Sequence, residues 1–348
     1  MINIIADDKI PLPADFPGNI GTLKRLATEN INATHLKNAD ALLVRSVTKI
    51  DAKLLQNTPI KFVATASAGV DNLDIKSLND HNIAWSHAPA CNANAVRDYV
   101  LCAIAALEKS GHLNTKKRRA GVIGVGAVGQ RVVTLLEKLG FEVLQNDPPR
   151  VLKETKYRSS ELNTFKDLDL ICCHTPLTFD EQFPTHHLID NAFLSQQKAG
   201  CIILNAGRGA VIDTQAIKKN KHLNYVLDVW DNEPNIDLDL LKQAKIATPH
   251  IAGYSMAAKY RAGDIIINAL CAHFNIKARK ISNTYSLSNL TTSIDLDHPQ
   301  NLNKILQTEN LCTRSEQFKQ TLLKQPNDIA QQFKDCRQDY PLRTEFIL

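Results

Sequence analysis

The amino-acid sequence predicts an α/β protein with two lobes, each built on a parallel sheet, followed by a small C-terminal module. At 348 residues the chain exceeds what one compact core usually holds. Short apolar runs alternate with amphipathic stretches, which is typical of parallel strands joined by crossover helices. The alternation restarts after a long helical stretch rich in Ala, Leu and Val, so two sheets are expected and not one.

The expected strands follow the apolar runs. In the first lobe they lie at 2–6, 41–44 and 61–66, and in the second lobe at 120–124, 141–145, 168–173, 201–205, 225–229 and 246–247. The second set is nearly continuous in apolar residues, as in strands buried on both faces of a parallel sheet. The helical stretch 92–109 is the expected hinge. A second helix, ending near residue 274, is expected to return the chain to the first lobe.

Composition limits the classes of protein to which the chain can belong. The net charge of +5 comes from 41 basic and 36 acidic side chains, a mild excess that suits a small anionic partner and not a nucleic acid. A basic run at 116–119 is expected to be a solvated loop.

Eight cysteines without a C-x-x-C pair predict free thiols in a reducing compartment. Because the sequence has neither a signal peptide nor a membrane-spanning stretch, the expected location is the cytoplasm.

A glycine-rich motif, G-V-G-A-V-G at 124–129, stands where an apolar strand leads into an amphipathic helix. Gly124 allows a tight turn, Gly126 lets the backbone approach a pyrophosphate, and Gly129 permits close packing of the helix on the strand. Val128 lies in the first turn of that helix, where free N–H groups are available to phosphates. This context predicts a dinucleotide-binding, Rossmann-like lobe.

An acid about twenty residues farther on indicates which dinucleotide is bound. Asp147 ends the next expected strand, where a carboxylate accepts hydrogen bonds from both ribose hydroxyls of NAD and repels the extra phosphate of NADP. Arg150 lies close by and weakens this argument, but the position of the acid favours NAD. The alternative is a glycine-rich turn that binds no nucleotide, and the strand, helix and acid together weigh against it.

Three loops at strand ends carry side chains suited to hydride transfer from a 2-hydroxy acid. This chemistry needs a cation for the carboxylate, a base for the hydroxyl proton, and a group that orients the base. Arg208, between two glycines, presents a bidentate fork to a carboxylate. His250 ends the last strand and is the expected base, and Glu233 is expected to hydrogen-bond its second ring nitrogen. Each of the three taken alone is an ordinary turn residue, but together behind a dinucleotide loop they predict a dehydrogenase.

The histidines do not show the spacing of a zinc site. The adjacent pair His186 and His187 is expected to point apart on either a helix or a strand. The sequence therefore predicts a reaction without a metal ion.

Five motifs of the second lobe together resemble the signatures of the D-2-hydroxyacid dehydrogenases. They are G-V-G-A-V-G at 124–129, H-T-P at 174–176, N-A-G-R-G at 205–209, L-D-V-W-D-N-E-P at 227–234 and T-P-H-I-A-G-Y-S at 248–255. Further motifs narrow the resemblance to the members of this family that act on 4-phospho-D-erythronate. These are V-R-S-V-T-K at 44–49, K-F-V-A-T-A-S-A-G at 61–69, A-C-N-A at 90–93 and D-P-P-R at 147–150. The resemblance runs from the N-terminus to about residue 274.

The resemblance implies NAD-dependent oxidation of 4-phospho-D-erythronate to 3-hydroxy-2-oxo-4-phosphooxybutanoate, a step toward pyridoxal 5′-phosphate. It implies that Arg208, Glu233 and His250 are catalytic. We choose Arg45 as a contact of the substrate phosphate, since that group needs a cation besides Arg208. The other implied contacts are Asp147, Thr175, Asp228 and Gly253 for the cofactor, and Ser46, Ser67 and Tyr254 for the substrate.

The resemblance also assigns a role to each part of the chain. Residues 1–92 are expected to form a flavodoxin-like substrate-binding lobe and 93–255 the NAD-binding Rossmann domain. Residues 256–281 are the returning helix, and 282–348 form a shortened dimerisation module, so a homodimer is expected. Two positions depart from the family pattern, which usually has Cys at 207 and Thr at 67. Gly207 keeps the loop permissive and Ser67 keeps a hydroxyl.

Two other functions stay open from the sequence. A dehydrogenase of 3-phosphoglycerate, or of an unphosphorylated 2-hydroxy acid, would use the same Arg208, Glu233 and His250. A non-catalytic NAD-sensing protein would keep the fold, although the intact catalytic side chains weigh against it. The expected partner is a small anionic phosphorylated sugar acid, with no nucleic acid and no membrane.

Overall fold

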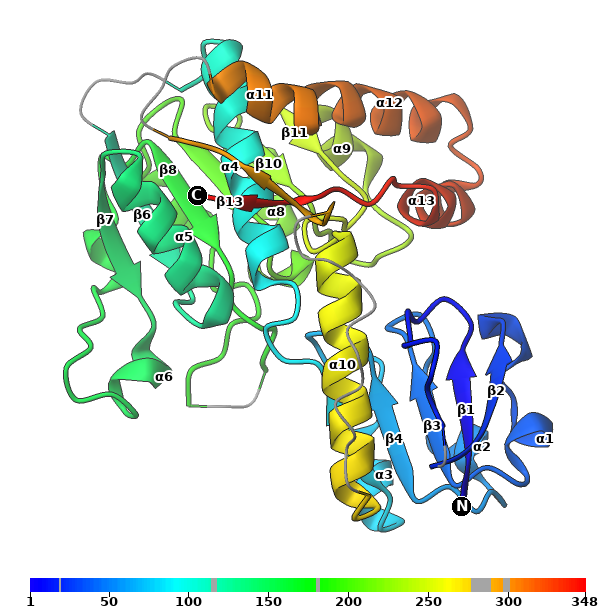
Figure 1. Cartoon of the computed structure of the whole chain (residues 1–348). Coiled ribbons are helices and arrows are strands. Elements are labelled where there is room, and N and C mark those ends of the chain that lie inside the picture. The colour runs from blue at the N-terminus through cyan, green and yellow to red at the C-terminus, as the bar shows by residue number, and fades with distance from the viewer. Residues whose placement is uncertain (19, 114–117, 180–181, 277–288, 297–300) are drawn as a thin grey trace. The chain divides into compact units, whose positions relative to one another are not determined.

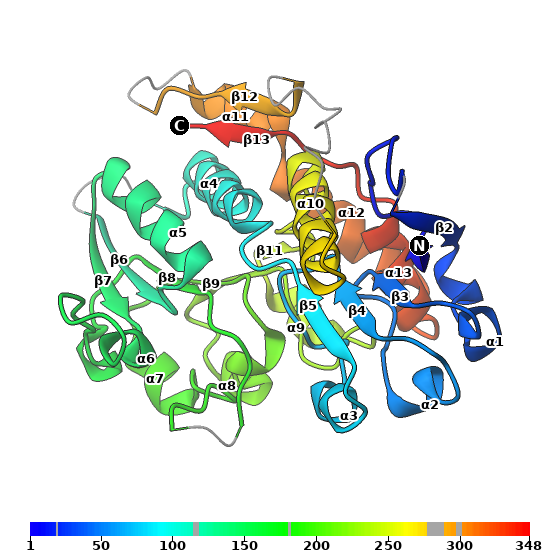
Figure 2. The same cartoon turned by 60° about the horizontal axis from the view of Figure 1, so that its bottom comes forward.

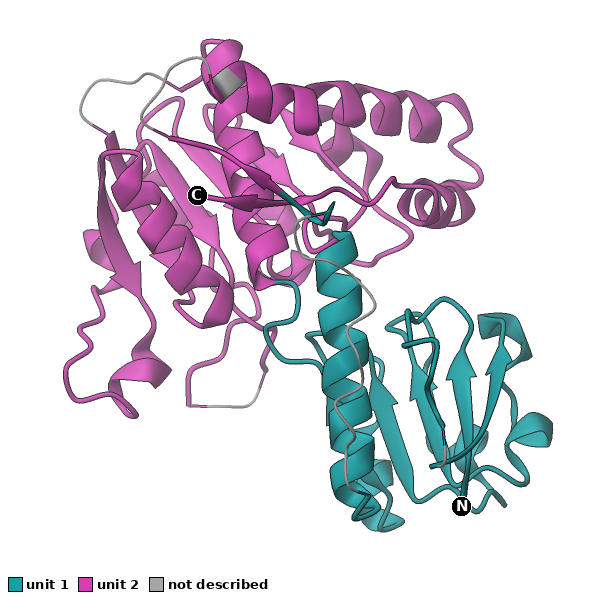
Figure 3. Ribbon diagram, viewed as in Figure 1, with its two compact units in different colours: residues 1–92, 255–291 teal, residues 93–254, 292–348 magenta. Residues whose placement is uncertain are grey.

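The computed structural model describes the chain except for residues 19, 114–117, 180–181, 277–288 and 297–300. The chain forms two compact units, coloured separately in Figure 3. Unit 1 consists of residues 1–92 and 255–291, and unit 2 of residues 93–254 and 292–348. Each unit holds its own parallel sheet, which confirms the predicted α/β class. Among the described residues, no helix is both long and apolar enough to cross a membrane.

Unit 1 contains a five-stranded parallel sheet in the order β2-β1-β3-β4-β5 (Figure 1). The central strands are buried on both faces, because Leu42 and Leu43 belong to two different apolar clusters. One face is covered by α10, whose Ile266 and Leu270 join the cluster of Leu43. The elements are β1 Ile2–Asp7, β2 Gly21–Leu26, α1 Ala33–Leu36, β3 Ala41–Val44, α2 Ala52–Leu55, β4 Phe62–Thr65, α3 Ile75–Asp80, β5 Ala84–His87 and α10 Met256–His273, with a 3₁₀ turn at Thr28–Asn30.

The two strands of unit 1 that the sequence did not reveal, β2 and β5, lie at the edges of its sheet. Every residue of β2 is either exposed or half-buried, and those of β5 are all half-buried. Edge strands commonly carry polar or charged side chains, such as Lys24 and Arg25 in β2. Such strands lack the continuous apolar run by which the central strands are recognised.

Unit 2 contains a six-stranded parallel sheet in the order β11-β10-β9-β8-β6-β7. Consecutive residues of one strand belong to different apolar clusters, as Cys172 and Cys173 do, so the sheet is buried on both faces. Helices α4 and α5 cover one face and α7, α8 and α9 the other (Figure 2). The elements are α4 Ala93–Lys109, β6 Arg118–Ile123, α5 Ala127–Lys138, β7 Phe141–Asn146, α6 Pro148–Val151, β8 Leu170–Cys173, α7 Asn191–Ser195, β9 Ile202–Asn205, α8 Thr214–Lys219, β10 Asn224–Leu227, α9 Leu238–Gln243 and β11 Ile246–Ala247, with 3₁₀ turns at Leu162–Thr164 and Gly209–Val211.

The C-terminal residues 292–348 belong to unit 2. The physical reason is that their apolar side chains complete both clusters of the sheet. Leu311 and Phe346 join the cluster on the α4 face, and Phe318 and Phe333 join the cluster on the opposite face. The elements are β12 Thr291–Ser293, α11 Asn301–Thr308, α12 Leu311–Lys324, α13 Ile329–Gln338 and β13 Glu345–Ile347.

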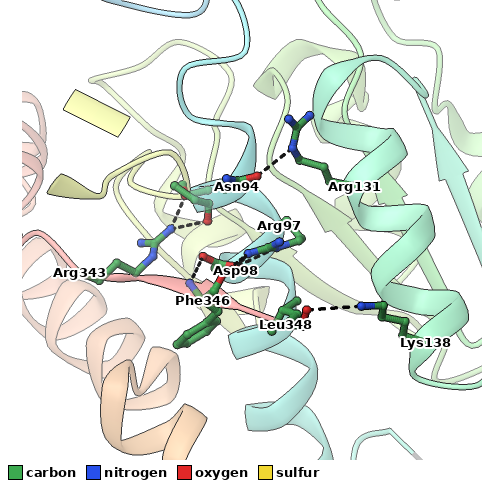
Figure 4. Close-up of polar contacts among 10 residues, drawn as sticks. Asn94, Arg97, Asp98, Arg131, Lys138, Arg343, Phe346 and Leu348 are labelled. Atoms are coloured by element: carbon green, nitrogen blue, oxygen red, sulfur yellow. Dashed lines mark hydrogen bonds and ion pairs between the residues drawn. The ribbon is translucent and has the colours of Figure 1, made fainter. Parts of the chain in front are cut away.

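A polar network fastens the end of the chain to α4 (Figure 4). The fully buried carboxylate of Asp98 accepts from the guanidinium of Arg97 at 2.6 Å and from the backbone N–H of Phe346 at 2.8 Å. The buried Arg343 donates to the carbonyl of Ala95 at 2.7 Å. Burial raises the pKa of Asp98 to about 6, although Arg97 and the bond from Phe346 oppose the rise.

This pKa predicts a pH-dependent stability. The unfolded chain ionises Asp98 near 3.8, whereas the folded chain holds the proton up to about pH 6. Between these values the folded state binds more protons, so the free energy of unfolding falls as the pH rises, by about 3 kcal/mol for this group. In Asp98→Asn this contribution is absent, while the acceptor for Phe346 is kept. Urea unfolding of both proteins between pH 4 and 7 measures the difference, and parallel curves would contradict the prediction.

The basic run at 116–119 is only partly the solvated loop that the sequence predicted. Arg118 and Arg119 are the first residues of β6. The side chain of Arg118 is only 9% exposed, pairs with Glu108 at 2.7 Å and lies over the ring of Phe141. The rest of the run lies outside the described residues.

Candidate active site

The predicted cofactor and catalytic loops all leave one edge of the unit 2 sheet. Its strands are parallel, so their carboxyl ends meet at the same edge. The residues that follow these ends are Gly124 after β6, Asp147 after β7, Thr175 after β8, Arg208 after β9, Glu233 after β10 and His250 after β11. Open α/β sheets bind their ligands at this edge.

The three glycines of the first loop differ in their surroundings. Gly124 has a φ of +82°, and a Cβ there would lie 2.7 Å from the backbone nitrogen of Thr175. A Cβ on Gly129 would lie 2.0 Å from the carbonyl oxygen of Gly124. A Cβ on Gly126, at the N-terminus of α5, would meet no described atom within 4 Å. The loop is therefore closely packed at Gly124 and Gly129 but open at Gly126. This open space suits a pyrophosphate at the N-terminus of α5.

Asp147 holds the glycine-rich loop as well as the start of α6. Its carboxylate accepts from the backbone N–H of Val125 at 2.8 Å and from that of Arg150 at 3.1 Å. Arg150, whose charge left the choice between NAD and NADP open in the sequence, pairs with Glu154 at 2.9 Å. Its guanidinium also lies 4.3 Å from the centre of the Tyr157 ring. The cation near Asp147 thus already has a carboxylate partner.

The H-T-P loop after β8 contains two buried polar groups without a hydrogen bond. The hydroxyl of Thr175 and both ring nitrogens of His174 are buried and make no hydrogen bond in the described structure. Burial lowers the pKa of His174 to about 4, so the ring is neutral at physiological pH. Buried polar groups in proteins are normally paired. An orphaned hydroxyl beside Gly124 is consistent with a cofactor contact at Thr175. No pattern in the sequence predicted that the ring of His174 is buried without a hydrogen bond.

The catalytic loops after β9 and β10 are packed against each other. The amide of Asn205 donates to the carbonyl of Arg208 at 2.9 Å and accepts from the N–H of Gly207 at 3.1 Å, which fixes the turn. A Cβ on Gly209 would lie 2.0 Å from the backbone of Trp230. The glycine here is therefore required, because it lets the Arg208 loop contact the loop that leads to Glu233.

Glu233 and His250 form the predicted pair. A carboxylate oxygen of Glu233 lies 2.7 Å from Nδ1 of His250, and the other accepts from the N–H of Trp230 at 2.9 Å. Burial raises the pKa of Glu233, but attraction to His250 and these hydrogen bonds outweigh it, so that the pKa is lowered. The carboxylate is therefore ionised at neutral pH. Nε2 of His250 makes no hydrogen bond within the described part of the chain.

The backbone of His250 is held in an uncommon conformation. Its φ is +59°, a left-handed value that only a few per cent of non-glycine residues adopt. The N–H of His250 donates to the carbonyl of Asp228 at 2.7 Å. The carboxylate of Asp228 accepts from the N–H groups of Ile251 and Ala252 at 2.7 and 2.9 Å, and from Thr248. Such strain persists only where neighbouring contacts maintain it, and it is concentrated at functional sites.

Asp228 supports the His250 loop in a way that the sequence did not reveal. Its side chain is buried, and its oxygens are bound to that loop. Burial raises the pKa of Asp228, and attraction to His250 and the hydrogen bonds offset only part of the rise.

Tyr254, which the resemblance implied as a substrate contact, lies in unit 2 four residues after His250. Nε of Arg337 donates to its hydroxyl at 2.9 Å, so a side chain of α13 meets this loop. Arg343 also binds the loop, through the carbonyls of Ile251 and Ala252. No motif marked Arg337, because it lies beyond the region of clear resemblance.

The three remaining expected substrate contacts lie in unit 1: Ser46 and Ser67, which the resemblance implied, and Arg45, which we chose. Ser46 follows β3 and is exposed, and Ser67 follows β4 and donates to the carbonyl of Gly69 at 2.7 Å. Arg45 is bound within the unit: its guanidinium pairs with buried Asp7 at 2.7 Å and donates to Thr28 at 2.7 Å. The guanidinium of Arg45, which we chose as the phosphate contact, is thus already bound by Asp7 and Thr28.

One expectation about the histidines was wrong. The rings of His186 and His187 do not point apart but stack, with their centres 3.9 Å apart. The pair lies in a turn and not in a helix or strand, and His187 has a φ of +52°, which brings both rings together. Among the described residues, no group of three or more His, Cys, Asp or Glu side chains is placed to hold a metal ion.

Comparison with known proteins connects this geometry to one family. The family model of the D-isomer specific 2-hydroxyacid dehydrogenase NAD-binding domain matches residues 97–252. The erythronate-4-phosphate dehydrogenase of Coxiella burnetii (strain RSA 331 / Henzerling II) is 42% identical over 348 residues, 99% of this chain and 94% of that protein. The one of Pseudomonas putida is 36% identical and covers 98% of this chain and 92% of its own. This similarity continues through the C-terminal residues, where the motif resemblance had become thin.

Solved structures share the fold at lower identity. The NAD⁺-bound 3-phosphoglycerate dehydrogenase of Entamoeba histolytica has a TM-score of 0.66 at 23% identity, and the match covers 82% of this chain and 99% of that one. The D-lactate dehydrogenase of Aquifex aeolicus, complexed with NAD and lactic acid, has a TM-score of 0.61 at 24% identity, covering 78% and 95%.

Proposed function

The chain belongs to the D-isomer specific 2-hydroxyacid dehydrogenases, within the group of erythronate-4-phosphate dehydrogenases, and from this premise we propose that it oxidises 4-phospho-D-erythronate with NAD. The product is 3-hydroxy-2-oxo-4-phosphooxybutanoate, a precursor of pyridoxal 5′-phosphate. The observation that carries this proposal is the ionised Glu233 bound to His250 at 2.7 Å, at the sheet edge that also bears Arg208.

Each of the three proposed catalytic side chains has a separate role in the reaction. Arg208 binds the substrate carboxylate through its planar fork. Nε2 of His250 accepts the proton of the C2 hydroxyl, as its Nδ1 is turned to Glu233. The carboxylate of Glu233 stabilises the positive charge that the ring then carries. When NAD is bound, its nicotinamide accepts the hydride that leaves C2.

The residues proposed to hold NAD are those of the glycine-rich loop and its neighbours. The open space at Gly126 and the unpaired hydroxyl of Thr175 support a pyrophosphate and a polar cofactor contact there. Asp147 would bind the adenosine ribose while it keeps its bond to Val125. The full proposed set is Gly124, Gly126, Val128, Gly129, Asp147, Thr175, Asp228 and Gly253.

Two alanine variants of the glycine-rich loop should behave differently. Gly126→Ala places a methyl group in open space, so we expect unchanged thermal stability but NAD binding at least about tenfold weaker. Gly129→Ala places a methyl group against the Gly124 carbonyl, so we expect it to lose more than about 2 kcal/mol of stability. Fluorescence titration with NAD and thermal denaturation measure both effects. If Gly126→Ala bound NAD with normal affinity, the proposal that the pyrophosphate lies at Gly126 would be wrong.

We propose Ser46, Ser67 and Tyr254 as substrate contacts, as the family resemblance implied. Arg45 remains a weaker proposal for the phosphate, because Asp7 and Thr28 already occupy its guanidinium. We also propose a homodimer working in the cytoplasm without nucleic acid. The eight free cysteines, six of them buried, are consistent with a reducing compartment.

The formation of NADH from NAD tests the function directly. Absorbance of the nicotinamide is followed with 4-phospho-D-erythronate and, in parallel, with D-3-phosphoglycerate. We expect a much higher kcat/KM with 4-phospho-D-erythronate. A higher kcat/KM with D-3-phosphoglycerate would overturn the proposal in favour of a related dehydrogenase.

A further inference from the structure

The proposed substrate carries two anionic groups at opposite ends of a short carbon chain, and Arg208 accounts for only one of them. A phosphate monoester is normally bound by charge-assisted hydrogen bonds, often from the fork of an arginine. On the basis of the proposed function, a second cationic side chain is needed to bind the other anion.

Arg337 of α13 places a guanidinium at the catalytic edge. Its Nε donates to the hydroxyl of Tyr254 at 2.9 Å, and its guanidinium carbon lies 5.7 Å from the centre of that ring. Tyr254 belongs to the loop that carries His250. The charge of Arg337 also reaches Glu233, since it is among the causes that lower the pKa of that carboxyl. A residue far away in the sequence thus contacts Tyr254 of the loop that carries His250.

The guanidinium of Arg337 has hydrogen-bonding capacity left. In the described structure its hydrogen bond is made through Nε, and both terminal nitrogens are left without a protein acceptor. No described carboxylate lies within ion-pair distance of it. Its side chain is half-buried, so a ligand would meet a partly desolvated cation. Two free N–H edges with a fixed Nε suit bidentate binding of a tetrahedral anion.

The other arginines near this edge are already engaged. Arg150 pairs with Glu154 at 2.9 Å. Arg343 is buried and donates to the backbone carbonyls of Ala95 and Ile251. Arg337 therefore differs from both, because its position is fixed but its charge is not paired.

The fold holds Arg337 in place from both sides. Before it in α13, Phe333 is 1% exposed in the apolar cluster of unit 2. After it, Arg343 is bonded to α4 and to the His250 loop, and the Asp98–Phe346 bond secures the following strand (Figure 4). Such support on both sides is what a binding side chain needs in order to be preorganised.

We propose that Arg337 binds the phosphate of the substrate and thereby selects phosphorylated over unphosphorylated 2-hydroxy acids. Its Nε stays on Tyr254, and its two terminal nitrogens donate to phosphate oxygens. Tyr254 then orients the arginine as well as facing the substrate. Arg337 is a specificity-determining residue and takes no part in proton or hydride transfer.

The test compares Arg337→Gln with Lys334→Gln. Glutamine can still bond to Tyr254 but carries no charge, and Lys334 is an exposed cation one turn earlier in the same helix with no contact to the loop. For Arg337→Gln we expect the KM for 4-phospho-D-erythronate to rise by about 10- to 100-fold, with kcat changed little. The kcat/KM for D-erythronate should stay as in the unaltered protein. Lys334→Gln should match the unaltered protein with both substrates.

A binding measurement separates affinity from turnover. Calorimetric titration of 4-phospho-D-erythronate into protein saturated with NADH, which cannot accept a hydride, should show the same loss of affinity in Arg337→Gln. Partial recovery in Arg337→Lys would support a contact by charge.

Two results would overturn the proposed role of Arg337 but leave the proposed function unaffected. One is an unchanged KM and affinity in Arg337→Gln. The other is an equal loss of kcat with both substrates together with a displaced pH profile, which would mean that Arg337 acts through Glu233. Failure of the unaltered protein to oxidise 4-phospho-D-erythronate would instead overturn the proposed function itself.

Discussion

Replacing His250 with asparagine is expected to lower kcat by about 10²- to 10⁴-fold, the usual contribution of a general base. Asparagine is chosen because it tolerates the left-handed backbone of this residue, with its φ of +59°, better than most side chains. The amide cannot accept the hydroxyl proton, while the loop can keep its bonds to Asp228. Steady-state rates of NADH formation measure the loss.

The control for this variant is cofactor binding. His250 is not among the proposed NAD contacts, so the dissociation constant for NAD and the melting temperature should stay close to those of the unaltered protein. A kcat within a few-fold of normal, in a protein that binds NAD, would mean that another group takes the proton. An unfolded or NAD-free variant would show instead that the side chain supports the loop.

Arg208→Ala should lower kcat/KM by about 30-fold to several thousand-fold, which corresponds to about 2–5 kcal/mol for the loss of one partner of a buried charged pair. The backbone of this turn is held by Asn205 and by the packing of Gly209 on Trp230, both independent of the arginine side chain. The loss should therefore reflect the missing substrate contact and not a collapsed loop. Initial rates at substrate concentrations far below KM give the value directly.

Arg208→Lys is the matched comparison. Lysine keeps the positive charge but loses the planar fork, so its kcat/KM should lie between those of the alanine variant and the unaltered protein. If lysine restored full activity, a point charge would suffice and the bidentate contact would be excluded. If alanine itself were fully active, Arg208 would not be the carboxylate anchor.

The sequence was most informative where strands are buried on both faces. The continuous apolar runs that became β6, β8 and β9 can only be covered by helices on each side, so the class of fold followed from them. The edge strands β2 and β5 were missed, because half-exposed strands need no apolar run. Element boundaries differed by a residue or two, as at β10, where the predicted strand continued to 229 and the structure ends it at Leu227.

The site residues that could be predicted are likewise those that stand in a recognisable local pattern. The placement of the loop glycines and of the acid at the end of β7 could be predicted, since both follow from a local spacing of residues. The pairing of Glu233 with His250 was also foreseen, because both follow neighbouring strands. Arg337 and Arg343 could not be found in this way. Their positions depend on how a segment of low hydrophobicity folds back onto the sheet, and no local pattern encodes that return.

The return of the C-terminal residues onto both faces of the unit 2 sheet has a consequence for how the protein is made. On the ribosome, the strands of this sheet emerge well before Leu311, Phe318 and Phe333, which complete the apolar clusters. Unit 1 likewise waits for α10, which is translated after β11, the last strand of the six-stranded sheet of unit 2. Neither unit can finish folding as soon as its first strands appear, so apolar faces of both sheets stay exposed during much of translation. Such nascent chains are the ones that depend on chaperones.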